Sequence, residues 1–202
     1  MIERAHKTDD KCQIRQEKGI SMIKRWLQNR KHTKIAHDLY CALVDQARNP
    51  SFYEKHGVAD TLEGRLDMIL LHMFLVVRYL QHSKTDTQPL IQILQEVMIR
   101  DIDRSLREIG VGDMNVGKQM KGVGASLLGR LKAYADAFNA EDKEQALSQV
   151  VIKNIYRTEI DDVNDVQVKA IVSYIIASLE SHVTDRNLNS YSTGKLVFPE
   201  WG

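Results

Sequence analysis

The chain has 202 residues, and its 28 lysines and arginines nearly balance its 27 aspartates and glutamates, which gives a formal net charge of +1. This balance excludes a uniformly basic nucleic-acid coat, and the 43% share of hydrophobic residues excludes a disordered chain. Only three prolines and 6% aromatic residues favour helices over strands. We therefore expect a helical globular protein that does not bind DNA.

The basic residues are concentrated near the amino terminus. Residues 1–40 contain ten lysines and arginines but only five acidic residues, a net charge of +5 that leaves −4 for the rest of the chain. Residues 1–21 lack the apolar centre of a signal peptide, and the two cysteines are too few for a disulfide scaffold, so we expect a flexible extension on a cytoplasmic protein. From residue 22 to 47, apolar residues recur at helical spacing along a basic amphipathic helix.

The start of this amphipathic helix combines basic and aromatic side chains. Such a face is typical of a solvated helix, but also of a helix that lies on a membrane surface or docks on a partner, or of one that contacts ribosomal RNA. These alternatives stay open, and the same residues would make the membrane or ribosome contact: Lys24, Arg25, Trp26, Arg30 and Lys31.

The next helix is predicted to be the centre of a bundle. After a connector at 48–60, residues 61–82 are apolar nearly all round, and Asp60 or Thr61 can cap the helix. The longest apolar run in this helix covers about half of the ~20 residues that cross a bilayer, so it is a core helix and not a membrane span. His72 lies in that run and is expected to be a hydrogen-bonded core histidine.

Helical spacing returns in four further segments. The first has Pro89 in its opening turn and runs to a tight connector at 110–117, and the second ends at Asn139. Two more helices precede an irregular tail, residues 187–202. The sequence thus predicts an all-α fold, a single globular bundle of six or seven helices formed by residues 22–186.

Two patterns invite a chemical interpretation. Gly112, Gly117 and Lys118 have the spacing of a phosphate-binding P-loop, but Gln119 stands where that loop needs a hydroxyl, and a helix precedes it instead of a strand. A turn between helices is favoured, and a nucleotide-binding enzyme is kept as an alternative. The seven histidines form none of the spaced pairs typical of a metal site, so we expect no metal, no cofactor and no catalytic residues.

The helix segment that ends at Glu108 is unusually dense in charge. Arg100, Arg104 and Glu108 follow one line of the helix, and Asp103 and Arg107 form a second pair at i,i+4 spacing. Arginines beside each carboxylate would keep it ionised, which argues against acid–base catalysis. An ion-pair lattice on the helix surface and a recognition surface are both compatible with this pattern.

Two longer blocks carry a family resemblance. The first, GVADTLEGRL, covers 57–66, the second, DIDRSLREIGVGD, covers 101–113, and Gly129-Arg130 follows in the same order. Together they resemble the signature of the ubiquinol–cytochrome c chaperone family over roughly residues 36–140.

The resemblance implies a non-enzymatic assembly factor without a cofactor. Mitochondrial members of that family engage newly made cytochrome b, together with a small partner subunit, near the ribosomal exit, and they support assembly of the ubiquinol–cytochrome c reductase complex. A member without a transit peptide resembles a bacterial homologue, which would act in the cytoplasm at the inner face of the membrane.

The resemblance also suggests where a client binds. The polar residues of the two blocks are not needed for packing of the core, so we expect their charges to bind polar loops of the client. A groove between helices would shield apolar segments of the client. A peripheral membrane adaptor is a further alternative. The residues expected to bind the client or partner are Asp60, Thr61, Arg65, Asp101, Asp103, Arg104, Arg107, Glu108, Asp113 and Lys118.

Overall fold

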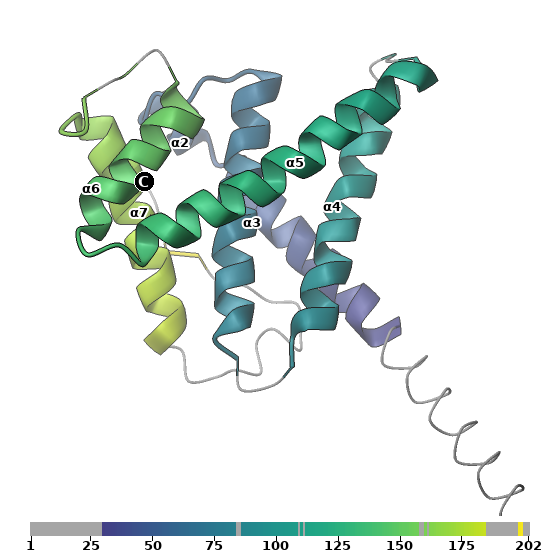
Figure 1. Cartoon of the computed structure of the whole chain (residues 1–202), viewed down its shortest axis with the longest axis horizontal. Helices are drawn as coiled ribbons and strands as arrows, with labels where there is room; N and C mark the ends of the chain where they lie inside the picture. The colour runs from purple at the N-terminus through teal and green to yellow at the C-terminus, as the bar shows by residue number, and fades with distance from the viewer. Residues whose placement is uncertain are drawn as a thin grey trace, which may run out of the picture.

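The computed structural model describes residues 30–83, 86–108, 110, 112–157, 160, 162–184 and 198–199. Throughout these ranges every regular element is a helix and no strand occurs, which confirms the all-α prediction. Figure 1 shows the helices packed into a bundle that one long helix, α5, crosses. No helix in these ranges has both the length and the apolar composition needed to cross a membrane. The extension expected at 1–21 and most of the expected tail lie outside the described residues.

The chain enters the bundle through a helix that includes residues 30–47. It is followed by α2 (Pro50–Glu54), so the connector expected at 48–60 contains a short helix. Pro50 does not merely stop the preceding helix: it begins the next one, because proline has no N–H to leave unpaired in a first turn. The Asn49 side chain caps α2 by accepting a hydrogen bond from the Ser51 N–H at 3.0 Å.

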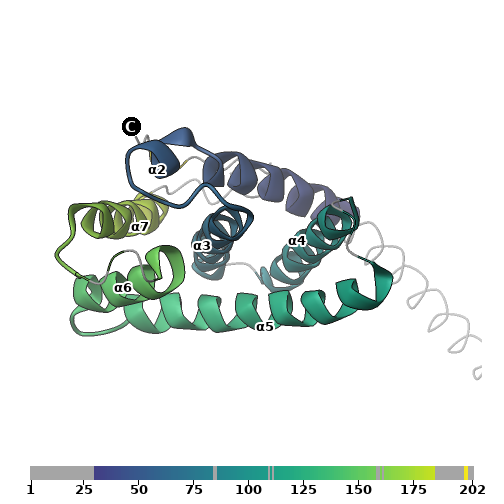
Figure 2. The same ribbon diagram turned by 90° about the horizontal axis from the view of Figure 1, so that it is seen from above.

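α3 (Leu62–Gln81) is the central helix, as its all-round apolar pattern predicts. The following helix, α4 (Gln88–Glu108), has Pro89 in its first turn as expected and runs back alongside α3 (Figure 1). Figure 2 shows that α3 and α4 lie between the first helix on one side and α5 on the other. Helices thus lie on more than one side of α3, and most of its residues from Asp67 to Leu80 are buried, which explains why this part can be apolar nearly all round.

α5 (Asp113–Phe138) begins earlier than the sequence suggested. The connector expected at 110–117 ends at Gly112, and the residues after it are already helical. Among the described residues of this connector, Gly110 is left-handed, with a φ of 88°, whereas Gly112 has a φ of −61°. Gly117 and Lys118 are thus helical, and no phosphate-cradling loop exists there to support nucleotide binding.

The remaining elements complete the bundle at the far end of α5. They are α6 (Lys143–Val151), a five-residue π-helix called η1 (Ile152–Tyr156), and α7 (Val166–Thr184). Two apolar clusters fill the interior and share α3: one packs α3 against α5, α6 and α7, and the other packs it against the first helix and α4. Phe198 contacts both clusters. α3 is therefore the helix that both apolar clusters share.

Candidate functional site

The first predicted block forms the start of α3. Thr61 is the N-cap, and its hydroxyl accepts a hydrogen bond from the Gly64 N–H at 3.1 Å. Gly64 is required for packing, because a Cβ at this position would lie 2.0 Å from the Ala59 carbonyl oxygen. Asp60 and Arg65 form an exposed ion pair, with 2.6 Å between Arg65 Nε and Asp60 Oδ1. Thr61 and Gly64 thus serve the local fold, whereas the ion pair faces solvent.

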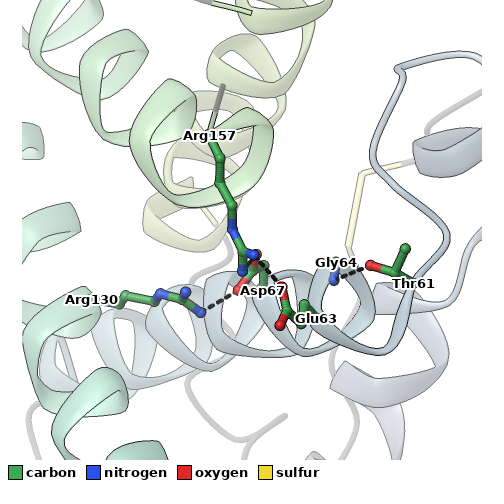
Figure 3. Close-up of polar contacts among 6 residues, drawn as sticks. All are labelled: Thr61, Glu63, Gly64, Asp67, Arg130 and Arg157. Carbon is green, nitrogen blue, oxygen red and sulfur yellow. Dashed lines mark hydrogen bonds and ion pairs between the residues drawn. The ribbon is translucent and has the colours of Figure 1, made fainter. Parts of the chain in front are cut away.

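A buried carboxylate lies within the first two turns of α3. The Asp67 side chain is only 2% exposed, and two arginines from distant parts of the chain approach it (Figure 3). Arg130 of α5 pairs with one carboxylate oxygen, and Arg157 Nη2 lies 2.9 Å from the other. Arg157 also pairs with the exposed carboxylate of Glu63. These four residues, the Asp67 cluster, join α3 to α5 and to the segment after η1.

Arg157 reaches α3 because the backbone before it is irregular. It follows directly after η1, and its φ of 57° is the only positive value among the non-glycine residues that the structure describes. A side chain in that conformation costs about 1–3 kcal/mol and persists only where its surroundings hold it. The Tyr156 hydroxyl donates to the His56 carbonyl at 2.7 Å, which fixes the end of η1 beside the approach to α3. The irregular turn and the Asp67 cluster therefore support one another.

The electrostatics of the Asp67 cluster suit a structural role. Burial raises the pKa of the Asp67 carboxyl, and the guanidiniums of Arg130 and Arg157 oppose this effect by stabilising the carboxylate. Both carboxylate oxygens are paired and closed to solvent, so a substrate has no access to them. Removing one member of such a buried pair is costly, because it leaves a charge without compensation. The cluster holds three segments in place and offers no acid–base chemistry.

The second predicted block forms a ladder of ion pairs on the surface of α4. Arg104 Nη2 lies 2.7 Å from Asp101 Oδ1, and Arg107 Nε lies 2.8 Å from Asp103 Oδ2. The two arginine side chains are 70% and 49% exposed. One rung is tied to the bundle, since the Tyr40 hydroxyl of the first helix donates to Asp101 at 2.9 Å. These four charged residues, the α4 ladder, present their arginines to solvent.

The two blocks lie toward the same end of the bundle but do not form one site. Figure 1 shows the start of α3 and the end of α4 at that end. Asp60 and Arg65 pair with each other, and neither has an ion-pair partner on α4 among the described residues. Three further predicted residues extend this end: Glu108 is exposed at the end of α4, Asp113 begins α5, and Lys118 is exposed on α5.

The predicted membrane- or ribosome-facing residues are only partly visible. Arg30 and Lys31 are exposed on the first helix. Lys24, Arg25 and Trp26 lie outside the described residues. The prediction for this basic face therefore stays a prediction.

A groove opens at the opposite end of α3, where sequence reasoning predicted no particular residues. It encloses about 1080 Å³ between the second half of α3 and the first half of α4, and residues of the first helix and α5 complete its walls. Arg78 and His32 line it, and each has a buried nitrogen, Nε of Arg78 and Nδ1 of His32, without a hydrogen-bond partner among the described residues. We call this feature the α3–α4 groove.

His72 is the hydrogen-bonded core histidine that the sequence predicts. It is fully buried, its Nδ1 lies 2.8 Å from the Met68 carbonyl oxygen, and its Nε2 lies 2.7 Å from the Tyr174 hydroxyl. The carbonyl can only accept, so Nδ1 carries the proton and Nε2 accepts from Tyr174. Burial lowers the pKa of His72 to about 4, which keeps the ring neutral. This histidine is part of the core and not a ligand or a base.

Asp67, Arg157 and Arg78 are the residues that sequence reasoning missed. Asp67 carried one usable signal, since it is an acidic residue at the start of the long apolar run and must find a partner if that run is buried. Nothing in the sequence marks Arg157 as its partner, because the pairing depends on the irregular turn after η1. Nothing in the sequence distinguishes Arg78 from any other basic residue near the end of a helix.

Comparison with known proteins adds the family to this geometry. A search of curated proteins finds no match. Among solved structures, the chain is similar to one described as the crystal structure of the Cbp3 homolog from Brucella abortus, with a TM-score of 0.73 and 26% sequence identity, over 90% of this chain and 96% of that one. The sequence profile of the ubiquinol-cytochrome C chaperone family matches residues 54–198, which include both predicted blocks and the whole Asp67 cluster. This protein therefore belongs to the ubiquinol-cytochrome C chaperone family.

Proposed function

We propose that this protein binds newly made cytochrome b and holds it while the ubiquinol–cytochrome c reductase complex is assembled. Membership of the chaperone family supports the assembly role. The observation that carries the finer proposal is the α4 ladder, whose arginines are exposed although packing of the core does not require them. Charges arranged in this way favour polar loops of a client over other surfaces and fix the register of the complex.

The proposed role is non-enzymatic. Acidic residues of the candidate site, Asp60, Asp101 and Asp103, pair with arginines, and the pairing lowers the pKa of the Asp60 and Asp103 carboxyls. Such groups stay ionised and make poor proton donors near neutral pH. They are suited to recognition of a partner surface and not to general acid catalysis.

The remaining parts of the proposal concern location and partners. Arg30 and Lys31 are exposed on the first helix, so its basic face could lie against anionic lipid at the inner face of the cytoplasmic membrane or against the ribosome. A small partner subunit would share the client with this protein. In this arrangement the chaperone meets cytochrome b as the client leaves the ribosome.

Co-translational capture tests the proposal directly. Tagged protein is added while cytochrome b from the same genome is translated in vitro with nanodiscs, and captured product is measured against an unrelated polytopic membrane protein made in the same way. We expect selective recovery of cytochrome b. Equal recovery of the two products would reduce the activity to general binding of apolar segments, and recovery of neither would contradict the proposal.

A further inference from the structure

The α3–α4 groove is too large and too mixed in character to be a packing defect. Its volume of about 1080 Å³ lies at the upper end for ligand-binding pockets. Apolar side chains from three helices, Phe74, Ile91 and Leu131, line it and offer contact to an apolar group. Four glutamines also line it, and each offers both a donor and an acceptor: Gln81, Gln88, Gln92 and Gln95.

Arg78 lines the groove without an ion-pair partner among the described residues. Its Nη2 donates to Asn139 at 3.0 Å, and its guanidinium lies 5.7 Å from the centre of the Phe138 ring, but no carboxylate pairs with it among the described residues. Within the part of the chain that the structure describes, its buried Nε has no acceptor, and the buried Nδ1 of His32 has no hydrogen-bond partner. Buried polar atoms without partners are rare because each costs about 1–3 kcal/mol. A carboxylate that enters the groove would give the Arg78 guanidinium the ion-pair partner that the described residues do not provide.

The other charges in the groove restrict what can bind. Asp86 and Glu96 also line it, so a polyanion such as a nucleotide would meet repulsion there. A helix would bring a backbone whose hydrogen bonds are already made and would leave the glutamines without a role. An extended polypeptide exposes an N–H and a C=O at nearly every residue, which matches amide side chains in both directions.

From this geometry we propose that the α3–α4 groove binds an extended segment of the client polypeptide, with an acidic side chain paired to Arg78 and a neighbouring apolar side chain over Phe74 and Leu131. The proposal rests on the proposed chaperone function and adds a second contact, at the other end of α3 from the α4 ladder. The ladder would orient charged loops of the client, whereas the groove would hold an unfolded stretch and keep it from aggregating.

A pair of matched substitutions tests the location of this contact. Gln92→Trp fills the groove, and Gln149→Trp places the same side chain on an exposed position of α6 outside it. Capture of in vitro translated cytochrome b should fall about tenfold for Gln92→Trp and stay unchanged for Gln149→Trp. Failure of the wild-type protein to capture cytochrome b would contradict the proposed function itself. Equal capture by both variants and the wild type would overturn the groove proposal alone.

A second experiment tests the chemistry of the bound segment. Overlapping peptides from the loops of cytochrome b are screened for binding to the full chain, and the tightest acidic peptide is compared with its Asp→Asn or Glu→Gln form on the wild type and on Arg78→Gln. On the wild type, we expect the neutral peptide to bind about tenfold more weakly than the acidic peptide. On Arg78→Gln, the two peptides should bind equally, as they would if the acidic side chain pairs directly with Arg78. An equal loss on both proteins, or no peptide that binds, would overturn the assignment of Arg78. Circular dichroism of Arg78→Gln confirms that the variant is folded.

Discussion

The Asp67 cluster and the α4 ladder are built from the same residue types and serve different purposes. Both combine aspartates with arginines, and both lie in segments that identify the family. Asp67 is closed to solvent and its partners come from two other parts of the chain, whereas the ladder pairs neighbours within one helix and exposes its arginines. A buried pair fixes the arrangement of helices, and an exposed pair within a helix contributes little to stability.

The residues of the family signature thus form two groups, one that stabilises the fold and one that is exposed to solvent. Thr61, Gly64 and Arg130 act within the fold, as a cap, a close contact and a buried partner. Arg104 and Arg107 are exposed and pair with aspartates of their own helix. Substitutions should therefore affect stability in the first group and client capture in the second.

The largest loss of stability is expected for Asp67→Ala. The substitution leaves the partly buried Arg130 without its partner, which should lower the free energy of unfolding by about 3 kcal/mol. Chemical denaturation measures this change, and Asp103→Ala provides a matched aspartate in the exposed ladder. If the two variants unfolded at the same denaturant concentration, the contrast between buried and exposed pairs would be wrong.

His72 makes the stability of the protein interior depend on pH. Its folded pKa is about 4, below the ordinary value of 6.5, so between these values the unfolded chain binds a proton that the folded protein excludes. The stability contributed by neutral His72 is present above pH 6.5 and is lost as the pH falls toward 4. Between pH 7 and pH 5 the loss should be about 2 kcal/mol.

A variant isolates this contribution from the other titrating groups. His72→Gln keeps a group that can accept from the Tyr174 hydroxyl but cannot take up a proton in this range. Chemical denaturation at several pH values gives the free energy of unfolding of each protein. The two values should converge as the pH falls, because only the wild type loses the histidine contribution. A constant difference between the two free energies of unfolding across this pH range would show that His72 titrates normally in the folded protein.

Features of the fold that depend on residues close together in the chain could be predicted from the sequence. The helical pattern, the central position of α3, the role of Thr61 and the burial of His72 follow from periodicity and capping rules, since they depend on residues close together in the chain. The pairing of Asp67 with Arg157 depends on residues 90 positions apart and on a left-handed turn after a π-helix. No local pattern encodes such a meeting.

The α3–α4 groove was beyond sequence reasoning for the same reason. Its walls come from four helices, and the requirement at Arg78 arises only when these helices are placed around it. The start of α5 shows the opposite problem: glycines at 112 and 117 suggested a loop, but Gly112 has an ordinary negative φ and Gly117 is helical. A glycine permits a turn without requiring one.

A smaller effect is expected at the start of α3. Thr61→Ala removes the acceptor for the Gly64 N–H and should lower the free energy of unfolding by about 1 kcal/mol. Thr61→Ser keeps the hydroxyl and should retain most of that stability. Thermal unfolding of the three proteins measures the difference, and a serine variant as unstable as the alanine variant would show that the hydroxyl is not the stabilising group.

The smallest effect on stability, together with a loss of client capture, is expected when Arg104 and Arg107 are both changed to Glu. Their side chains are exposed, and each forms an ion pair with an aspartate of the same helix, so the unfolding transition should hardly move. Reversing two charges that face a client should lower capture of translated cytochrome b about tenfold, mainly at low ionic strength, since salt screens such contacts. Arg100→Glu is a matched control, because it reverses one exposed charge on the same helix that was not among the predicted contacts. Loss of helical circular dichroism in the double variant would instead make the ladder part of the fold, and the distinction between the two sets of charges would then disappear.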